Sequence, residues 1–587
     1  MSISSKPSLQ CLVGSLDRLA RVLVLAGSIL WLVGAEAQEA SAQVSSEKAT
    51  EIVRVFFPDR DLRNKILISF KASIIRTDDV QGYHVMDAGQ EEIDLLLAAG
   101  LEVVASPGDA PVIQRLPGFP CYGTVEENFL AAQTMAANAP SLASFVDIGD
   151  SWEKTAGLGG YDIGVLRLGN SANPGPKPSL FLLCALHARE YATAPLCLAF
   201  AQHLVGGYDV DPDATWLLDH HEIHLVLHAN PDGRKWAEAG YFWRKNTNQN
   251  YCSPTSSNRG VDLNRNFPFQ WACCGGGSNS ECSATYRGPS PESESETQAV
   301  VDYMRSIFPD QRAPGQNSPA PDDATGIHID IHSYGNLVLW PWGYTNTPAP
   351  NGLALQTLGR KFAYWNQYFP EQAIGLYPVD GATDDFGYGD LGVAAFTFEI
   401  GTEFFESCTA FENTIVPDNL PALIYAAKAA RTPYLTPLGP DLTAAALDLE
   451  TVARGQGAAL TATLDDTRYN QTNGTEPSQA IAAAEYYIDV PPWNSGTPHA
   501  LQASDGVFDA SQENVEGVVD TAGLALGRHI LFVRGQDAEG NWGAIGALFI
   551  EVEAPPGVPV LDTFDRWLIG ALLLCTGSIA MFSRKRI

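Results

Sequence analysis

The sequence predicts an α/β fold for the middle of the chain, with a mixed, mostly parallel sheet that carries helices on both faces. Short apolar runs alternate there with amphipathic segments, as in residues 180–186, 191–205 and 222–228. Alternation at this spacing is typical of parallel or mixed sheets. Beyond residue 440 the helical periodicity ends, and strand-like pieces separated by Gly, Asp and Asn turns predict an immunoglobulin-like β-sandwich.

The length of the chain, 587 residues, exceeds what one hydrophobic core usually organises, so several domains are expected. A strand-like run at 65–70 and a helix-like run at 91–99 predict a small α/β segment before the main domain. The breaker-rich stretch 107–111 suits a boundary and proteolysis. We therefore divide the chain into residues 1–37, 38–117, 118–437 (α/β domain), 438–554 (β-sandwich) and 555–587.

The first 37 residues have the pattern of a removable export signal. Arg18 and Arg21 precede an apolar run at 22–34, and Ala35-Glu-Ala37 offers the small residues that a signal peptidase reads. The apolar run is short for crossing a bilayer, which favours cleavage over the alternative of an anchor helix.

The last residues, 555–587, have the composition of a membrane tail. An apolar run at 567–582 precedes Arg584-Lys-Arg586, whose charge places that end on the cytoplasmic side. The tail resembles the IPTL-type sorting signals of Gram-negative bacteria, although Val558-Pro-Val-Leu-Asp562 departs from the pattern at three positions. A plain tail anchor is the alternative. We expect an exported bacterial protein, periplasmic, surface-bound or secreted, with membrane contact through this tail.

Charge and cysteine content limit the partners and the compartment. Acidic residues outnumber basic ones by 68 to 36, and the net charge of -32 excludes a nucleic-acid partner, which would need Lys and Arg clusters. Export favours disulfides among the ten cysteines. Four of them crowd a Gly-rich stretch with open connectivity, whereas Cys184, within an apolar run, is expected to be a buried free thiol. The four are Cys252, Cys273, Cys274 and Cys282.

Three strand-like runs each end in a side chain that can bind a metal or move a proton. Residues 180–186 lead to His187, a run beginning at 326 leads to His332, and a run beginning at 393 leads to Glu399. Ligands of open α/β sheets bind outside the carboxyl ends of the strands. We therefore expect these three side chains to share one site.

A catalytic zinc site is predicted from the string His187-Ala-Arg-Glu190 together with His332. Two His and one Glu leave a fourth position for water, which is the pattern of catalytic rather than structural zinc. Such a metal lowers the pKa of its water to about 7 and polarises a carbonyl. A carboxylate at the end of an apolar strand, such as Glu399, is costly to bury without a partner, which favours a functional role for it.

Further motifs follow one another in order between residues 121 and 435, and their joint occurrence is far more specific than any one of them. They are Tyr122-Gly-Thr-Val-Glu-Glu127, His187-Ala-Arg-Glu190, Asn230-Pro-Asp-Gly233, Trp243-Arg-Lys-Asn246, Val261-Asp-Leu-Asn-Arg-Asn-Phe267, His332-Ser-Tyr334 and Phe396-Thr-Phe-Glu-Ile400. With this set, the chain resembles the zinc carboxypeptidase family of the carboxypeptidase A and B type.

The resemblance implies a zinc metallocarboxypeptidase that hydrolyses the C-terminal peptide bond of peptides or proteins. It implies that Asn264, Arg265 and Tyr377 bind the free carboxylate of the substrate. A guanidinium with an adjacent amide suits bidentate capture of a carboxylate. The segment 38–117 would then be the prodomain of a zymogen.

Other roles also come from the resemblance. Arg244 would stabilise the oxyanion of the tetrahedral intermediate, and Glu399 would pass a proton from the zinc-activated water to the leaving amine. Asp262 would orient His187, and Arg189 would line the substrate path. Asp384, seven residues after Tyr377, falls in the loop that forms the floor of the specificity pocket, where an Asp goes with a preference for C-terminal Lys or Arg.

Two other classes of function remain open. The same metal constellation serves peptidases of bacterial wall peptides and deacylases of small amides, but Arg265 and Tyr377 speak against these substrates. A non-catalytic binding scaffold, helped by the sandwich, is disfavoured because Glu399 and the ligands are all present. The sequence does not identify what the sandwich binds.

Overall fold

The computed structural model describes residues 50–58, 62, 66, 74–78, 81–106, 116 and 118–555. It divides the chain into two compact units, residues 1–113 and 114–587. The predicted export signal lies outside the described residues, as does the predicted membrane tail beyond its first residue. Within the described part of the chain, none of the helices combines the length and apolarity that a membrane span requires.

The first unit contains a four-stranded antiparallel sheet of order β2-β3-β1-β4. Helix α3 (Gln90–Ala98), found where a helix was predicted, buries Ile93 and Leu96 against Val53 and Val55 of the sheet. The strand predicted at 65–70 is wrong at Ile66, its one described residue, which is helical. The strands are β1 (Thr50–Phe56), β2 (Ile74–Asp78), β3 (Tyr83–Gly89) and β4 (Val103–Ala105).

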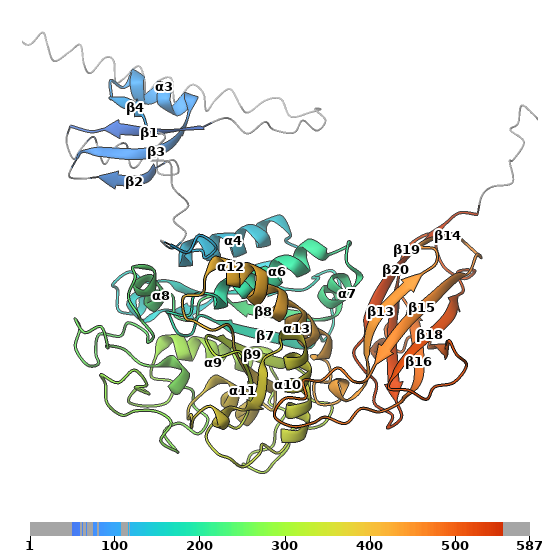
Figure 1. The fold of residues 1–587 in the computed structure, drawn as a ribbon. Coiled ribbons are helices and arrows are strands. Elements are labelled where there is room, and N and C mark those ends of the chain that lie inside the picture. The colour runs from blue at the N-terminus through green and yellow to red at the C-terminus, as the bar shows by residue number, and fades with distance from the viewer. Residues whose placement is uncertain are drawn as a thin grey trace, which may run out of the picture. The chain divides into compact units, whose positions relative to one another are not determined.

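The second unit is built on an eight-stranded mixed sheet of order β11-β10-β12-β9-β7-β8-β6-β5 (Figure 1). Its central strands β12, β9, β7 and β8 are parallel, and antiparallel pairs flank them. The structure thus confirms the predicted fold class. The strands are β5 (Ala143–Asp150), β6 (Asp162–Leu168), β7 (Ser179–Cys184), β8 (Glu222–Val226), β9 (Ile327–His332), β10 (Leu337–Trp340), β11 (Phe369–Gln372) and β12 (Ala394–Glu399).

Helices cover both faces of this sheet because its strands are apolar on both sides. In β7, Leu180 and Leu182 belong to one buried cluster, and Phe181 and Leu183 to the other. The first cluster includes helices α4 (Val125–Asn138), α6 (Thr193–Gly207), α7 (Pro212–His220), α10 (Gly352–Asn366) and α13 (Val416–Ala429). The second includes α9 (Ser295–Ile307) and α11 (Thr383–Leu391). Smaller helices are α5 (Trp152–Thr155), α8 (Pro231–Glu238) and α12 (Cys408–Ala410).

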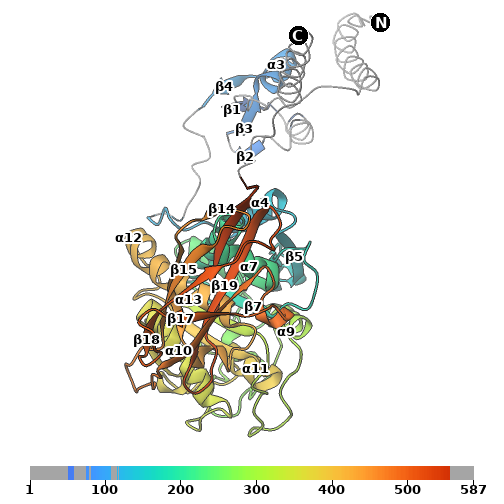
Figure 2. The ribbon, with the colours of Figure 1, turned by 90° about the vertical axis from the view of Figure 1, so that its right-hand side faces the viewer.

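The C-terminal part consists of strands, which Figure 2 shows in front of the α/β part. They form an eight-stranded set, β13-β15-β18-β17-β16-β19-β20-β14, around one buried core that includes Leu460, Leu501 and Leu531. That this part belongs to the immunoglobulin-like class stays a prediction. The strands are β13 (Asp441–Leu447), β14 (Thr451–Ala453), β15 (Ala458–Asp465), β16 (Ile481–Ile488), β17 (His499–Ala503), β18 (Gln512–Val519), β19 (Gly527–Asp537) and β20 (Gly546–Glu553).

Among the described residues, four disulfides link Cys121 to Cys408, Cys184 to Cys197, Cys252 to Cys282 and Cys273 to Cys274. The expectation of a free thiol at Cys184 is therefore wrong. An apolar run around a cysteine suits a buried disulfide as well as a thiol, and helix α6, packed on β7, brings Cys197 to it. The pairing of the adjacent residues Cys273 and Cys274 resolves the connectivity that the sequence left open.

The C-terminal strands are fixed to the α/β part by two buried cations of helix α10. Nη1 of Arg360 donates to the carbonyl oxygens of Asn470, Thr472 and Gly474 at 2.8–3.1 Å, and Nε lies 3.3 Å from Oε1 of Glu476. Nζ of Lys361 lies 3.2 Å from Oδ1 of Asp441. Both side chains are almost fully buried, so Arg360 holds the loop after β15 on the helix and Lys361 holds the start of β13 there.

The Arg360→Ala substitution is expected to lower the free energy of unfolding by about 2 kcal/mol, because several charge-assisted hydrogen bonds are lost at once. Arg305→Ala is the matched control, since Arg305 also lies on a helix but its side chain is 41% exposed. The control should cost no more than about 0.5 kcal/mol. Denaturant unfolding of both variants measures the difference, and equal losses would contradict a fixed junction.

Candidate active site

Neighbouring strand ends bring the predicted ligands together. His332 is the last residue of β9 and is paired in register with Glu399, the last residue of β12. His187 follows the end of β7, the neighbour of β9 on the other side, after a left-handed bend at Ala185 (φ 53°). Oγ1 of Thr193 accepts from the Ala185 amide and donates to the Glu190 carbonyl, both at 3.0 Å, which fixes this turn.

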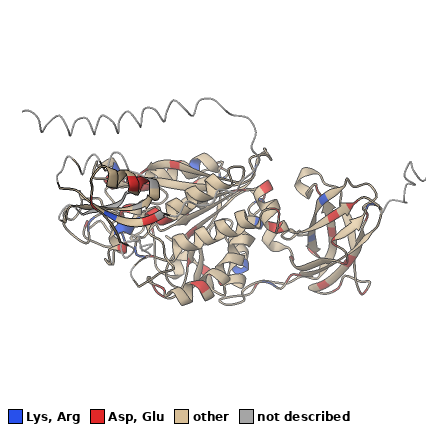
Figure 3. Ribbon diagram, turned by 90° about the horizontal axis from the view of Figure 1, so that it is seen from above, with Lys and Arg blue, Asp and Glu red and all other residues tan. Residues whose placement is uncertain are grey.

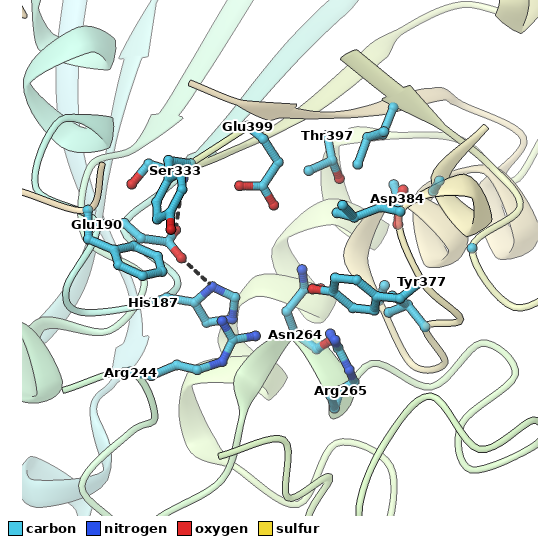
Figure 4. Close-up of a pocket in the computed structure, with 18 of the residues that line it drawn as sticks. His187, Glu190, Arg244, Asn264, Arg265, Ser333, Tyr377, Asp384, Thr397 and Glu399 are labelled. Carbon is cyan, nitrogen blue, oxygen red and sulfur yellow. Dashed lines mark hydrogen bonds and ion pairs between the residues drawn. The ribbon is translucent and has the colours of Figure 1, made fainter. Parts of the chain in front are cut away.

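Glu190 lies between the two histidines. Nδ1 of His187 is 2.8 Å from Oε1 of Glu190, and Nδ1 of His332 is 3.0 Å from Oε2. The candidate ligand atoms of the three residues all lie within 4.8 Å of one another. The backbone amide of Ser333 donates to Oε2 at 3.2 Å, which holds the carboxylate in place (Figure 4). Two imidazole nitrogens and a carboxylate therefore face one point.

Two buried carboxylates orient the imidazole rings through the Nε2 atoms, the ring nitrogens that do not face Glu190. Nε2 of His187 lies 3.0 Å from Oδ1 of Asp262, and Nε2 of His332 lies 2.8 Å from Oδ2 of Asp330. Because each Nε2–H donates to a carboxylate, each Nδ1 keeps its lone pair for the centre, as metal-binding histidines require. The residues present thus fit a zinc ion, which His187, Glu190 and His332 would hold.

Asp330 is a site residue that the sequence reasoning missed. It is fully buried, and Thr383 donates its hydroxyl proton to Oδ2 at 2.6 Å. A signal was available in the sequence, because Asp330 stands two residues before His332 and so shares its face of the strand. Asp262 lies where the resemblance implied, beside His187.

Asp262 also holds Arg244. Its Oδ2 accepts from Nε of Arg244 at 3.2 Å and from Nη2 at 2.9 Å, while Oδ1 faces His187. Burial alone would raise the pKa of Asp262, but Arg244 and His187 outweigh it and hold that pKa well below its usual value. One ionised carboxylate therefore positions both a metal ligand and the predicted oxyanion-binding guanidinium.

Asn264 and Arg265 belong to a short 3-10 helix, Leu263–Arg265. Oδ1 of Asn264 accepts from the Thr383 amide at 3.0 Å. Arg265 is 2% exposed and donates from Nε to the Gly276 carbonyl and from Nη1 to its neighbour's carbonyl, whereas Nη2 has no partner among the described residues. A buried cationic donor without an acceptor is suited to an anionic ligand.

The Gly-rich loop after the Cys273–Cys274 disulfide supports this arginine. The backbone amides of Cys274, Gly275 and Gly276 all donate to Oδ2 of Asp380 at 3.0–3.1 Å. Asp380 lies three residues beyond Tyr377 in the sequence, so the loop connects the segment of Tyr377 to the support of Arg265. Tyr377 itself is 45% exposed, with its ring 5.8 Å from the Arg265 guanidinium carbon.

One cavity of about 320 Å³ contains nearly all predicted site residues (Figure 4). His332 does not line this cavity, but its Nδ1 lies 3.0 Å from Oε2 of Glu190, which does. Arg189 is held at the cavity by the rings of Phe242 and Phe404, 4.3 and 4.1 Å from its guanidinium carbon. The predicted residues that line it are His187, Arg189, Glu190, Arg244, Asn264, Arg265, Tyr377, Asp384 and Glu399.

Two carboxyls in the cavity have raised pKa values. Burial raises the pKa of Asp384 to about 6. Burial, opposed by His332 and reinforced by Glu190, raises the pKa of Glu399 to about 8. Asp385, the neighbour of Asp384, instead accepts the Gly343 amide at 3.0 Å and does not line the cavity. Asp384 is therefore the acid that faces the cavity from the first turn of α11.

Comparison with known proteins agrees with this geometry. The sequence matches the family model described as zinc carboxypeptidase over residues 130–419. Carboxypeptidase B of Homo sapiens is 30% identical over 338 residues, which cover 55% of this chain and 73% of that protein. The chain belongs to the zinc carboxypeptidase family.

Two other relatives match a smaller share of this chain than carboxypeptidase B does. The zinc carboxypeptidase of Saccharothrix mutabilis subsp. capreolus is 32% identical over 48% of this chain, and the matched region spans 62% of that relative. Mast cell carboxypeptidase A of Rattus norvegicus is 31% identical, with 46% and 61% covered. Among solved structures, bovine thrombin-activatable fibrinolysis inhibitor in complex with tick carboxypeptidase inhibitor is 25% identical, over 53% of this chain and 97% of that chain, with a TM-score of 0.44. Carboxypeptidase A from Helicoverpa armigera is 21% identical, over 65% and 98%, with a TM-score of 0.45.

The Asp262→Asn substitution is expected to weaken zinc binding by roughly 10- to 100-fold, because His187 loses the acceptor that fixes its tautomer. Competition with a metal chelator measures the affinity. Asp302→Asn, on the exposed face of α9, is the control and should leave it unchanged. Wild-type affinity in Asp262→Asn would contradict the orienting role.

Proposed function

We propose that this chain is a zinc metallocarboxypeptidase that removes the C-terminal residue of peptides or proteins. The observation that carries the proposal is that Nη2 of Arg265 has no partner among the described residues and that Arg265 lines the same cavity as His187, Glu190 and Glu399. This donor suits a free carboxylate, and the metal-binding cluster beside it suits hydrolysis of the adjacent carbonyl.

The residues of the cavity have different roles in the proposed reaction. Zinc, when bound, polarises the scissile carbonyl and activates water. Arg265, Asn264 and Tyr377 hold the terminal carboxylate and so place the last peptide bond. Glu399 takes a proton from the attacking water and transfers it to the leaving amine nitrogen as the carbon–nitrogen bond breaks. Arg244, held by Asp262, balances the negative charge that develops on the carbonyl oxygen.

The other candidate functions have less support. A wall-peptide peptidase that cuts inside a chain, or an amide deacylase, would leave the buried donor of Arg265 without a carboxylate. A non-catalytic scaffold would have no need for Glu399 in the same cavity as the metal-binding cluster. The β-strand domain has no assigned partner.

An assay of the purified chain tests the proposal. Peptides ending in Arg, Leu or Glu are incubated with the chain, with and without a zinc chelator, before and after limited proteolysis between the two units. We expect chelator-sensitive release of the terminal residue alone. No release of any terminal residue at several pH values, or cleavage at internal bonds, would overturn the proposal.

The Glu399→Gln substitution is expected to lower kcat by roughly 10³-fold while zinc stoichiometry stays at the wild-type value, because general-base catalysis is lost and the ligands are kept. In the wild type, kcat/KM should rise with pH as Glu399 loses its proton. The midpoint of this rise should lie above 4.5, the ordinary pKa of a Glu side chain. It should not exceed about 8, the raised pKa of Glu399, because a bound cation lowers the pKa of a nearby carboxyl. Survival of turnover in the variant would show that another group is the base.

We propose that Asp384 gives a preference for C-terminal Lys or Arg. Three carboxylates line the cavity; Glu190 faces the histidines and Glu399 is the proposed base, which leaves Asp384, and no cationic side chain among the described residues forms an ion pair with it. Asp384→Asn should lower the ratio of kcat/KM for Arg-ending to Leu-ending peptides by roughly 10- to 100-fold, the worth of a charge-assisted hydrogen bond. In the wild type, this ratio should fall as pH drops below about 6, because Asp384 then becomes protonated. The Leu-ending peptide is the internal control, and an unchanged ratio would contradict the assignment.

We also propose that residues 38–117 act as the prodomain of a zymogen, and that the chain is exported by a bacterium and contacts the membrane through its C-terminal tail. The first unit is compact on its own and has its own buried core, which supports a separable segment. Four disulfides in the second unit favour an oxidising compartment outside the cytosol.

A further inference from the structure

A second cavity, of about 290 Å³, lies where the C-terminal strands meet the α/β part. Trp216 of α7 and the end of helix α13 form one side of it, and Trp493, Arg534 and Trp542 of the β-strand domain form the other. It is nearly as large as the cavity of the candidate active site, and none of its residues takes part in the proposed reaction.

The lining of this cavity is cationic, in a chain whose net charge is -32. Lys428, Arg431 and Arg534 line it, and no acidic side chain does. Figure 3 shows acidic residues on helices and strands of both parts of this unit. A site lined by one sign of charge favours a ligand of the opposite sign.

Arg431 is the cation that lacks a counter-charge. Lys428 is paired with Asp213 at 2.5 Å, and Arg534 with Glu485 at 2.7 Å. Arg431 has no ion pair within the described ranges: its Nη2 donates to the His220 carbonyl at 3.1 Å, and its Nε is buried without an acceptor. Burial lowers the pKa of Arg431 to about 10, which leaves it charged at neutral pH. An uncompensated cation with reduced hydration is costly, and an anionic ligand would remove that cost.

His221 provides a second unsatisfied donor. It lines the cavity, is 1% exposed, and neither of its ring nitrogens has a hydrogen-bond partner among the described residues. Burial, reinforced by Arg431, holds the pKa of His221 well below its usual value, so the ring is neutral and carries one N–H. Buried polar groups are nearly always hydrogen-bonded, and a ligand that accepts this N–H would satisfy it.

Aromatic rings hold the guanidinium groups and leave flat apolar walls. The guanidinium carbon of Arg431 lies 4.3 Å from the centre of the Trp493 ring, and that of Arg534 lies 4.1 Å from the Trp542 ring. Trp216 packs against Trp493 with ring centres 5.8 Å apart. Stacking keeps the arginines rigid, and indole faces suit the flat or CH-rich face of a ring.

We propose that this cavity binds a small cyclic organic acid, with its carboxylate on Arg431 and His221 and its ring against the tryptophans. The acid carries no cationic group, because no acidic side chain lines the cavity to receive one. Free amino acids, including those that the proposed peptidase reaction would release, are therefore poor ligands. Two sources share the required chemistry, the uronic acids of polysaccharides and aryl carboxylates. The proposal does not depend on the proposed peptidase function.

The test uses the full chain with Arg265→Gln, which removes the other carboxylate-binding group. Tryptophan fluorescence is titrated with D-glucuronate and phenylacetate, and with their neutral counterparts D-glucose and phenylacetamide. We expect saturable binding of at least one acid at millimolar concentration, at least tenfold tighter than its neutral counterpart, and no comparable binding of phenylalanine. The tighter acid identifies the source. Equal binding of acid and neutral ligand, or no binding of either acid, would overturn the proposal.

A second variant locates the binding. Adding Arg431→Gln should weaken binding of the acid at least tenfold, whereas adding Arg305→Gln, on an exposed helix position, should leave it unchanged. Unaltered binding in the Arg431→Gln chain would place the acid elsewhere and refute the assignment. If the chain with Arg431→Gln fails to fold, as thermal unfolding would show, the comparison of acid with neutral ligand still tests the proposal. That comparison uses the chain in which Arg431 is intact.

Discussion

The site depends on the buried carboxylate of Asp262. It receives the imidazole of His187 on one oxygen and the guanidinium of Arg244 on the other, and the Asn264 amide donates to it at 3.2 Å. Taking a carboxylate out of water costs several kcal/mol, and only well-placed partners offset that cost. Because Asp262 precedes the helix that carries Asn264 and Arg265, the same contacts also fix where the substrate's carboxylate would bind. The predicted metal ligand, the predicted oxyanion-binding arginine and the proposed carboxylate-binding residues are thus held by one group.

The positions at strand ends could be predicted from the sequence, since an apolar run followed by His or Glu fixes both the strand and the edge at which the side chain emerges. His332 and Glu399 were each predicted to end a strand, and the structure adds that these strands, β9 and β12, are parallel neighbours in which the two residues are paired. The role of Asp330 was missed because it stands inside the apolar run, although its spacing of two residues from His332 places both on one face of the strand. The pairing of Cys184 with Cys197 depends on how α6 lies on β7, which periodicity does not reveal.

The distinction between Asp384 and Asp385 shows the same limit. Adjacent carboxylates at the start of α11 are equivalent in sequence, yet Asp385 accepts a hydrogen bond from the Gly343 amide, whereas Asp384 lines the cavity.

The contacts between helix α10 and the C-terminal strands could not be predicted from the sequence either. The partners of Arg360 and Lys361 lie more than 75 residues further along the chain, and the burial of both side chains follows from that packing.

Arg265 shows how the two sides of the site are made rigid together. Its Nε and Nη1 already donate to carbonyl oxygens, so the proposed substrate carboxylate would meet a guanidinium held in a fixed orientation. One of those carbonyls belongs to Gly276, where a Cβ atom would lie 2.5 Å from the Asp380 nitrogen, so only glycine allows this approach. Three amides of the same loop converge on Asp380, and the loop follows directly from the bond between Cys273 and Cys274. In the proposed reaction, the distance from the donor that binds the terminal carboxylate to the scissile carbonyl must be fixed, so this donor, rather than the metal-binding cluster, would restrict cleavage to the last residue.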